Sequence, residues 1–180
     1  MTDTVLLVID AQQSFYHRGY NEAAETPAFE QALSTLIAGC QAKGIPVVDV
    51  FHVEDEGPFS LDSGLVTRLP FITHEATGTV QKRIHNALTD SGLMTWLVQN
   101  QVKHVIISGL RTEQCCETTA RVASDFGYRV TFVTEATLTF PITHDGITLS
   151  IADLRHRTES VLINRFAQIR TVEGCLQELA

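Results

Sequence analysis

Cysteine is scarce in this sequence and long apolar runs are absent, and both shortages exclude classes of protein. The 180 residues contain only four cysteines: Cys40, Cys115, Cys116 and Cys175. They are too few and too irregularly spaced for a disulfide scaffold, and no pair has Cys-x-x-Cys spacing. The apolar run at residues 4–9 falls far short of the roughly 20 residues that a membrane span needs. No basic leader accompanies this run, so we expect a cytoplasmic protein with reduced thiols and no membrane partner.

Basic residues are outnumbered as well, with 13 Lys and Arg against 21 Asp and Glu and a net charge of -8. This balance argues against nucleic acid as a partner. Neither a Gly-x-Gly-x-x-Gly nor a phosphate-loop pattern occurs, so nothing supports a nucleotide, and we expect no cofactor. The apolar content of 44% fits a packed core, and the length fits a single domain spanning residues 1–180.

Strand-like and helix-like segments alternate along the chain. Continuous apolar runs predict strands at residues 4–9, 46–52, 104–108, 130–133 and 160–163. Start and stop signals predict helices from Thr26 up to Gly44, from Asp90, from Cys115 to Phe126, and from Thr171. The alternation predicts an α/β fold, a three-layer α/β/α sandwich around a mainly parallel, Rossmann-like sheet, for which we expect six strands.

Sheets of this kind bind ligands beyond the carboxyl ends of their strands, where the strand order reverses. We therefore look for functional residues in the segments that follow strands. The longest such segment, Glu54–Thr79, is acidic and contains several glycines and prolines. Connections of this length are uncommon, so it is a candidate lid or pocket wall, and a surface insertion is the alternative.

Asp10 ends the first buried run. Burying an unpaired carboxylate is costly, so this residue must be paired, hydrogen-bonded or functional. A structural role in capping the following turn is as compatible with its position as a catalytic one. A phosphatase that uses such an aspartate needs a second carboxylate two residues later, and Gln12 occupies that position.

Cys115 and Cys116 stand where a predicted strand turns into a helix. The free N–H groups and partial charge of a helix N-terminus lower a thiol pKa and can hold an oxyanion. We expect one cysteine to be reactive and the other to be a small apolar residue, and helix geometry does not choose between them. Lys82 follows the long segment, where it could orient a carboxylate and a thiolate or simply face solvent.

Three segments together resemble the motifs of one family. They are VIDAQQSF at residues 8–15, KRIHNAL at residues 82–88 and GLRTEQCCETT at residues 109–119. In this order and at these separations the chain resembles the isochorismatase-like cysteine hydrolases, which include nicotinamidases and N-carbamoylsarcosine amidase. The second motif departs from the family pattern at Asn86 and Leu88, and the RFA at residues 165–167 is also typical of the family.

The resemblance implies a role for each motif residue. Cys115 becomes the nucleophile, Asp10 the general base and Lys82 the cation that holds the two together. Cys116 falls where the family usually has an aliphatic residue. The resemblance also implies a cis peptide at Leu110–Arg111, with the Arg111 and Cys115 N–H groups directed at an oxyanion. We assign four residues to the substrate-binding or oxyanion part of the site: Leu110, Arg111, Gln12 and Phe15.

The implied reaction is hydrolysis of a small amide, carbamoyl or related C–N bond through a thioester. Isochorismate itself is a vinyl ether, and the enzymes that hydrolyse it lack the cysteine, so Cys115 argues against that substrate. Nicotinamidases bind a metal through Asp-x-His and a further histidine. The residues available here do not have that spacing, so we expect no metal: Asp49, His52, Asp55, His74 and His85.

Two other functions are compatible with the sequence. The chain could be a non-catalytic scaffold of the same fold, or a thiol redox sensor that uses Cys115 and Cys116, although adjacent cysteines rarely form a relaxed disulfide. If it is an enzyme, the guanidinium of Arg111 or of Arg18 is a candidate to meet a substrate carboxylate. The family also forms dimers and larger assemblies, so the resemblance implies a homo-oligomer.

Overall fold

Six strands form one parallel sheet at the centre of the molecule. The computed structural model describes residues 2–179. The strands lie in the order β3-β2-β1-β4-β5-β8, with these bounds: β1 Thr4–Ile9, β2 Val47–His52, β3 Gly78–Lys82, β4 His104–Leu110, β5 Arg129–Leu138 and β8 Gln168–Ile169. Every residue of β1 and of β4 is buried, which is why their sequences show continuous apolar runs rather than alternation.

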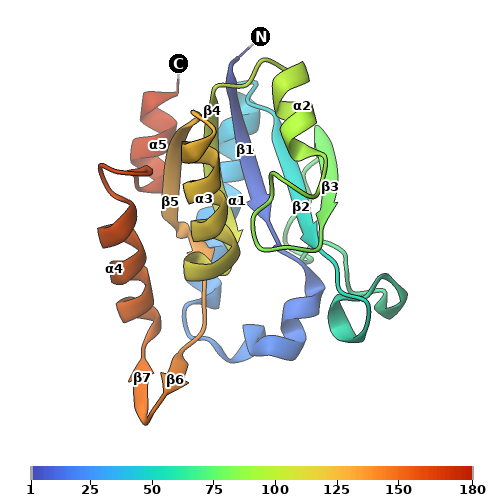
Figure 1. The fold of residues 1–180 in the computed structure, drawn as a ribbon, viewed down its shortest axis with the longest axis vertical. Helices are drawn as coiled ribbons and strands as arrows, with labels where there is room; N and C mark the ends of the chain where they lie inside the picture. Colours follow the sequence, from blue (N-terminus) through green and yellow to red (C-terminus); the bar gives the residue numbers. More distant parts are fainter. Residues whose placement is uncertain (1, 180) are drawn as a thin grey trace.

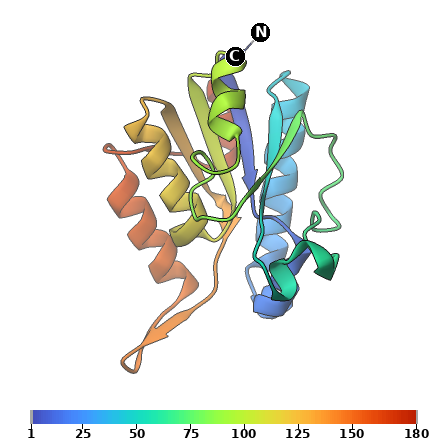
Figure 2. The same cartoon turned by 45° about the vertical axis from the view of Figure 1, so that its right-hand side comes forward.

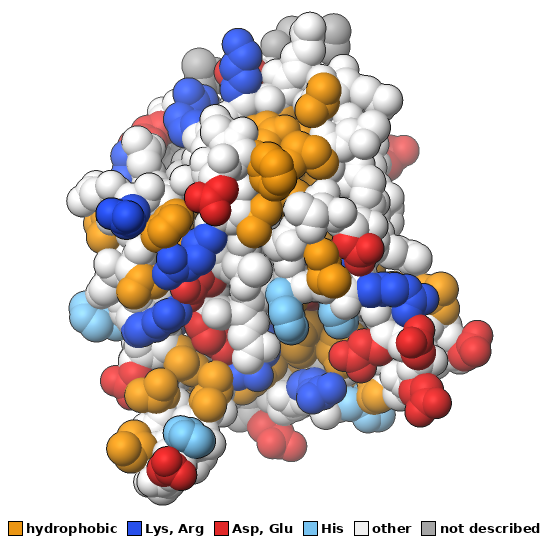
Figure 3. Space-filling view, in the orientation of Figure 1, with side chains coloured by type: hydrophobic (Ala, Val, Ile, Leu, Met, Phe, Trp, Pro, Cys, Tyr) orange, Lys and Arg blue, Asp and Glu red, His pale blue; other side chains and the backbone are white. Residues whose placement is uncertain are grey.

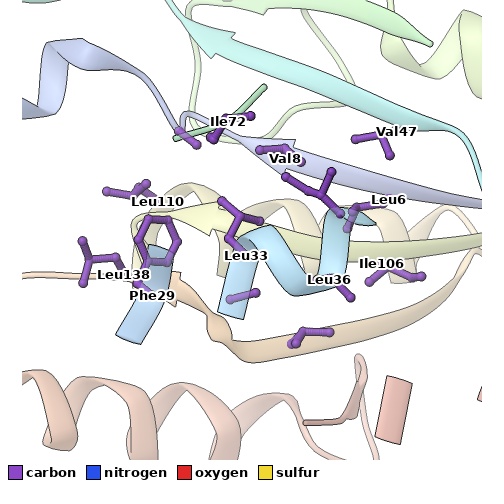
Figure 4. Close-up of a cluster of buried hydrophobic side chains, with 14 of the residues drawn as sticks. Leu6, Val8, Phe29, Leu33, Leu36, Val47, Ile72, Ile106, Leu110 and Leu138 are labelled. Carbon is purple, nitrogen blue, oxygen red and sulfur yellow. The ribbon is translucent and has the colours of Figure 1, made fainter. Parts of the chain in front are cut away.

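Helices cover both faces of this sheet, as Figures 1 and 2 show. They are α1 Thr26–Ala42, α2 Leu93–Gln99, α3 Glu117–Asp125, α4 Ile151–Leu162 and α5 Val172–Glu178. Helices α1 and α5 supply one apolar core, and α2, α3 and α4 supply the other. Alternate β1 side chains enter each core, with Leu6 and Val8 facing α1 (Figure 4) and Leu7 facing the opposite layer. The predicted three-layer α/β/α fold is confirmed.

The strand order reverses between β1 and β4. The chain first runs outward from β1 through β2 to β3, and β4 then returns to the other side of β1. The two strands pair in parallel from Thr4 with His104 to Ile9 with Gly109. Their carboxyl ends therefore lie side by side, which brings Asp10 and the turn that carries Cys115 to one edge of the sheet.

One strand prediction was wrong. Residues 160–163 are not a strand, because Ser160–Leu162 form the last turn of α4. Leu154, Thr158 and Leu162 are buried at four-residue intervals, and a short apolar run cannot distinguish such a helix from a strand. The two remaining strands of the sheet, β3 and the two-residue β8, were not among the predicted ones, because neither has a continuous buried run. A small hairpin that the sequence did not predict precedes α4 and projects from the body (Figure 1): β6 Ile142–His144 and β7 Ile147–Leu149.

The helix predicted at residues 115–126 starts in a different form. A wide helical turn, Thr112–Cys116, comes first, and α3 proper begins at Glu117. The hydroxyl groups of Thr112 and Thr137 form a hydrogen bond, with 2.7 Å between their oxygens, which connects the turn to β5. The turn places Cys115 above the strand ends rather than along the side of a regular helix.

The segment Glu54–Thr79 is anchored along much of its length. Its Arg68 forms an antiparallel bridge with Gln12, and Leu69 and Ile72 are buried in the α1 core. Arg68 also donates to the buried carboxylate of Asp49 at 2.5 Å. This part of the segment is therefore fixed against the body. None of the helices among residues 2–179 is long and apolar enough to cross a membrane.

Gly109 allows β1 and β4 to approach each other at the site. It has φ +113°, and a Cβ built on it would lie 1.9 Å from the Ile9 carbonyl oxygen. We expect Gly109→Ala to lower the free energy of unfolding by more than about 4 kcal/mol, because backbone cannot yield as a flexible side chain can. Urea unfolding followed by circular dichroism measures this.

Gly127→Ala is the matched control. Gly127 also has a positive φ, +86°, but a Cβ at this position would have no neighbour within 4 Å. The substitution should cost only the roughly 1–2 kcal/mol of a left-handed backbone. Equal losses in the two variants would show that backbone conformation alone, not the approach of β1, makes glycine necessary at position 109.

Candidate active site

A cavity of about 170 Å³ opens at the carboxyl edge of the sheet, beside the ends of β1, β2 and β4. Ten residues line it: Asp10, Phe15, Arg18, His52, Glu54, Phe59, His85, Arg111, Gln114 and Cys115. Four of the residues singled out in the sequence, Asp10, Phe15, Arg111 and Cys115, therefore share one small space. This concentration of titratable groups in a cavity marks the candidate active site.

Lys82 joins the groups on the cavity floor. Its ammonium donates to Asp10 Oδ2 at 2.9 Å and to Cys115 Sγ at 3.4 Å. Asp10 and Lys82 are each only 1% exposed. Burial acts to lower the lysine pKa, but the charge of Asp10, aided by Cys115, raises it above its ordinary value. Lys82 is therefore a permanent cation that both other groups contact.

Asp10 leaves the sheet in a conformation that turns it towards the site. Its φ is +52°, while its N–H donates to the Val50 carbonyl of β2 at 2.7 Å. One carboxylate oxygen accepts from Lys82, and the other, Oδ1, is buried with no hydrogen-bond partner among residues 2–179. A buried carboxylate oxygen in this state can accept a proton from a neighbouring group.

Cys115 is a neutral thiol in the resting site. Burial is the main cause, and the negative charge of Asp10 adds to it; together they raise its pKa to about 12, against the opposing effect of Lys82. The sequence analysis expected the helix N-terminus to lower this pKa, whereas burial and the charge of Asp10 raise it. The thiol therefore needs a base at the moment of attack.

Cys116 has a different environment. It is fully buried in the core beneath α3, and its sulfur lies 3.8 Å from the Ser108 carbonyl oxygen. Burial raises its pKa well above the ordinary value. The two cysteines thus differ as expected of neighbours on a helical turn, with Cys115 in the cavity wall and Cys116 in the packing.

The other predicted residues fall into two groups. Phe15 and Arg111 line the cavity, and the peptide bond between Leu110 and Arg111 is cis, as the resemblance implied. The Leu110 side chain lies in the α1 core. Gln12 is fully buried below the cavity, where its side chain accepts from the His52 N–H at 2.8 Å and donates to the His52 carbonyl at 3.0 Å. Its side chain therefore ties β1 to β2 and is not among those that line the cavity.

His52 is the main residue that sequence reasoning missed. Its Nδ1 lies 3.2 Å from the Lys82 ammonium, and burial together with that cation lowers its pKa. A neutral ring nitrogen can accept from the ammonium. The sequence did contain a signal for this residue, because His52 is the last residue of β2 and so lies at the carboxyl edge of the sheet. The sequence analysis considered it only as a metal ligand. Phe59 and Glu54 also line the cavity, so the beginning of Glu54–Thr79 is a pocket wall.

Of the residues considered as metal ligands in the sequence, His52 and His85 line the cavity, and the other three make contacts outside it. Asp49 lies below the sheet edge in contact with Arg68 and with His74, whose Nε2 is 3.0 Å from Asp49 Oδ1. His52 contacts Lys82, and Asp55 pairs with Arg83 at 2.6 Å. Among residues 2–179, no three His, Cys, Asp or Glu side chains are grouped so that they could hold a metal ion.

Comparisons with known proteins place this arrangement in context. A family model described as "Isochorismatase domain" matches residues 4–171. The chain is 30% identical to Nicotinamidase 3 of Arabidopsis thaliana over 151 residues, 75% of this chain and 73% of that protein. It is 24% identical to YrdC of Bacillus subtilis (strain 168), an uncharacterized isochorismatase family protein, over 96% of this chain and 94% of that one. The solved structure of a cysteine hydrolase from Pseudomonas syringae pv. phaseolicola 1448A has a TM-score of 0.89 at 20% identity and covers 99% of this chain and 94% of its own.

The charge of Asp10 predicts how fast Cys115 is alkylated. Because Asp10 raises the thiol pKa, Asp10→Asn should lower it and increase the iodoacetamide rate at pH 8 by about tenfold, one pKa unit being a typical effect of a close like charge. Mass spectrometry of the labelled protein measures the rate at each cysteine. Cys40 and Cys175 are buried and serve as internal controls, so their rates should not change. Slower labelling in the variant would mean that Asp10 already holds the thiol proton at rest.

Proposed function

Because the chain belongs to the isochorismatase family, whose domain model matches residues 4–171, we propose that it hydrolyses a small amide, carbamoyl or related C–N bond with Cys115 as nucleophile. One observation carries the proposal. The Lys82 ammonium contacts both the Asp10 carboxylate and the Cys115 sulfur on the floor of a small cavity. A nucleophile, a base and a cation that orients the base are the parts that covalent hydrolysis needs.

The first half-reaction forms a thioester. Asp10 Oδ1 takes the Cys115 proton as the sulfur attacks the carbonyl carbon, because a thiol with a pKa of about 12 is not ionised beforehand. The carbonyl electrons move to oxygen, and the N–H groups of Arg111 and Cys115 stabilise that oxyanion. When the intermediate collapses, the C–N bond breaks and the leaving nitrogen takes the proton from Asp10.

The second half-reaction uses the same residues. Asp10, again a carboxylate, accepts a proton from water while the water oxygen attacks the thioester carbon. The C–S bond then breaks, and the sulfur recovers a proton from Asp10 as the acid leaves. Lys82 stays charged throughout, because its pKa is raised, and it stabilises the aspartate each time the carboxylate is regenerated.

The cavity limits the substrate to a small molecule. Its volume of about 170 Å³ is close to the roughly 150 Å³ cavity that accommodates benzene in an engineered protein. The similarity to Nicotinamidase 3 supports an amide as the bond that is cleaved. The proposal gives the reaction to protein side chains and does not extend to nicotinamide, because the sequence lacks the Asp-x-His spacing of the nicotinamidase pattern.

The remaining expectations from the sequence stay predictions. They are a single domain over residues 1–180, a cytoplasmic location and a homo-oligomer. None of them enters the proposed steps, whose acting groups are Asp10, Lys82 and Cys115 of one chain.

Variants at the two adjacent cysteines test the proposal. Cys115→Ala should abolish ammonia release from a panel of small amides and ureido compounds, because no other group can carry the acyl intermediate. Cys115→Ser should lose nearly all activity, since Asp10 is too weak a base for a hydroxyl. Cys116→Val should fold and remain active, because a similar-sized apolar replacement in a core costs under about 1.5 kcal/mol.

The outcomes separate the rival functions. If no compound in the panel releases ammonia with the wild-type protein, the hydrolase fails and a scaffold is favoured. If Cys116→Val is inactive while Cys115→Ala is active, the nucleophile is misassigned. Peroxide inactivation that a reductant reverses, with loss of two hydrogens in the mass and dependence on both cysteines, would support the redox sensor instead.

A further inference from the structure

Two arginines line the same small cavity. Arg18 ends the short helical turn Gln13–Arg18 that follows β1, and Arg111 follows β4. They are therefore supplied by two segments that are far apart in the sequence. In a chain with 13 basic residues and a net charge of -8, two cations at one cavity call for an anionic partner.

A row of aromatic rings supports both guanidinium groups. The Phe15 ring centre is 5.2 Å from that of Phe59 and 6.2 Å from that of Phe140. Arg18 lies over the Phe59 ring at 5.5 Å, and Arg111 lies over the Phe140 ring at 5.3 Å. Cation–π contacts of this kind hold a guanidinium at a defined place. The two charges are thus positioned at opposite ends of the row, with Phe15 between them.

The two arginines differ in what else they contact. Arg111 donates to the Phe140 carbonyl at 2.9 Å and to Thr139 Oγ1 at 3.2 Å, and it lies 3.3 Å from Glu113. Arg18 makes no hydrogen bond and no ion pair with any residue in the described range 2–179. Arg111 is therefore partly neutralised, while the solvent-exposed Arg18 has its donors free to bind a ligand in the cavity.

The carboxylates nearby do not supply the missing partner. Acidic side chains gather over the segment after β2, at the lower right of Figure 3: Glu54, Asp55, Glu56 and Asp62. Of these, only Glu54 lines the cavity, and it lies 3.6 Å from His52. Asp55 pairs with Arg83.

We infer that the substrate carries a carboxylate, which Arg18 binds as its principal partner with Arg111 on the facing wall, while the scissile amide carbon lies at Cys115. The inference rests on the proposed hydrolase function and names its substrate class, the half-amide of a short dicarboxylic acid. A guanidinium recognises a carboxylate through two parallel hydrogen bonds. This arrangement also fits the cavity volume of about 170 Å³, because such a molecule has roughly the size of a benzene-like ligand.

Succinamate and succinamide make the sharpest substrate pair, because they have the same shape and differ in one carboxylate against one amide. The wild-type kcat/KM, measured by ammonia release, should favour succinamate by at least about tenfold, since charge-assisted bonds are the stronger ones. The preference should weaken as salt is raised, because Arg18 is exposed to solvent and ions screen exposed charges.

Variants assign the preference to the arginines. Arg18→Ala should lower the succinamate-to-succinamide ratio of kcat/KM by about tenfold, mainly through KM for succinamate, and Arg18→Lys should recover part of it. Arg111→Ala should lower the same ratio by less, because its charge is already shared with Glu113. Arg129→Ala is the matched control. That arginine is 58% exposed at the start of β5, at the other end of the sheet, and the ratio should not change.

Binding to the Cys115→Ala protein separates the two proposals. Calorimetry should show that this protein binds succinate more tightly than succinamide. Adding Arg18→Ala should remove that difference in affinity. If no amide is hydrolysed but this difference is found, the hydrolase proposal fails and the anion site stands. If amides are hydrolysed with succinamide equal to or better than succinamate, or if Arg18→Ala slows both alike, the carboxylate inference is overturned and the hydrolase stands.

Discussion

The buried pair of Lys82 and Asp10 is the interaction on which the rest of the site depends. Each residue is 1% exposed, and removing two charges from water costs several kcal/mol per ion unless the partners meet in good geometry. Lys82 ends β3 and Asp10 follows β1, with β2 between them in the sheet. The pair therefore spans the end of β2. There His52 contacts the Lys82 ammonium, in addition to the contacts that Asp10 and Cys115 make with it. Three neighbouring strands are held in register at their carboxyl ends by one cation, and losing it would leave an unpaired buried carboxylate.

That cation also explains why the thiol rests in its neutral form. Lys82 contacts Cys115, but most of its charge is matched by Asp10 at 2.9 Å against 3.4 Å for the sulfur. The thiol accordingly gains little from it, and burial with the aspartate charge raises the thiol pKa to about 12. The proton stays on the Cys115 sulfur at rest. Asp10 Oδ1, which has no hydrogen-bond partner among residues 2–179, can accept that proton when the sulfur attacks a carbonyl carbon.

The sequence predicted most strands of the sheet and the three residues on the cavity floor, but it did not predict the pKa of the Cys115 thiol. Continuous apolar runs identified β1, β2 and β4, because strands buried on both faces have mostly apolar side chains on each face. The run at residues 160–163 misled, since the last turn of α4 is also apolar on the side that packs. Asp10, Lys82 and Cys115 were found by their motifs, and they do meet. The thiol pKa was not predictable, because it follows from the balance of burial against two opposite charges, and none of these distances can be read from the chain.

The site also divides into a floor and walls that are built differently. The floor comes from residues at or next to strand ends, and the parallel register of β1 with β4 and of β2 with β3 determines where each one lies. The walls come from connecting segments: Phe15 and Arg18 after β1, Phe59 after β2, and Arg111 after β4. Replacing a wall side chain changes the shape and charge of the cavity without moving any strand, because its backbone is not part of the sheet ladder. Chemistry and specificity are therefore separable in this fold, since the sheet holds the reacting groups while the connections choose what reaches them.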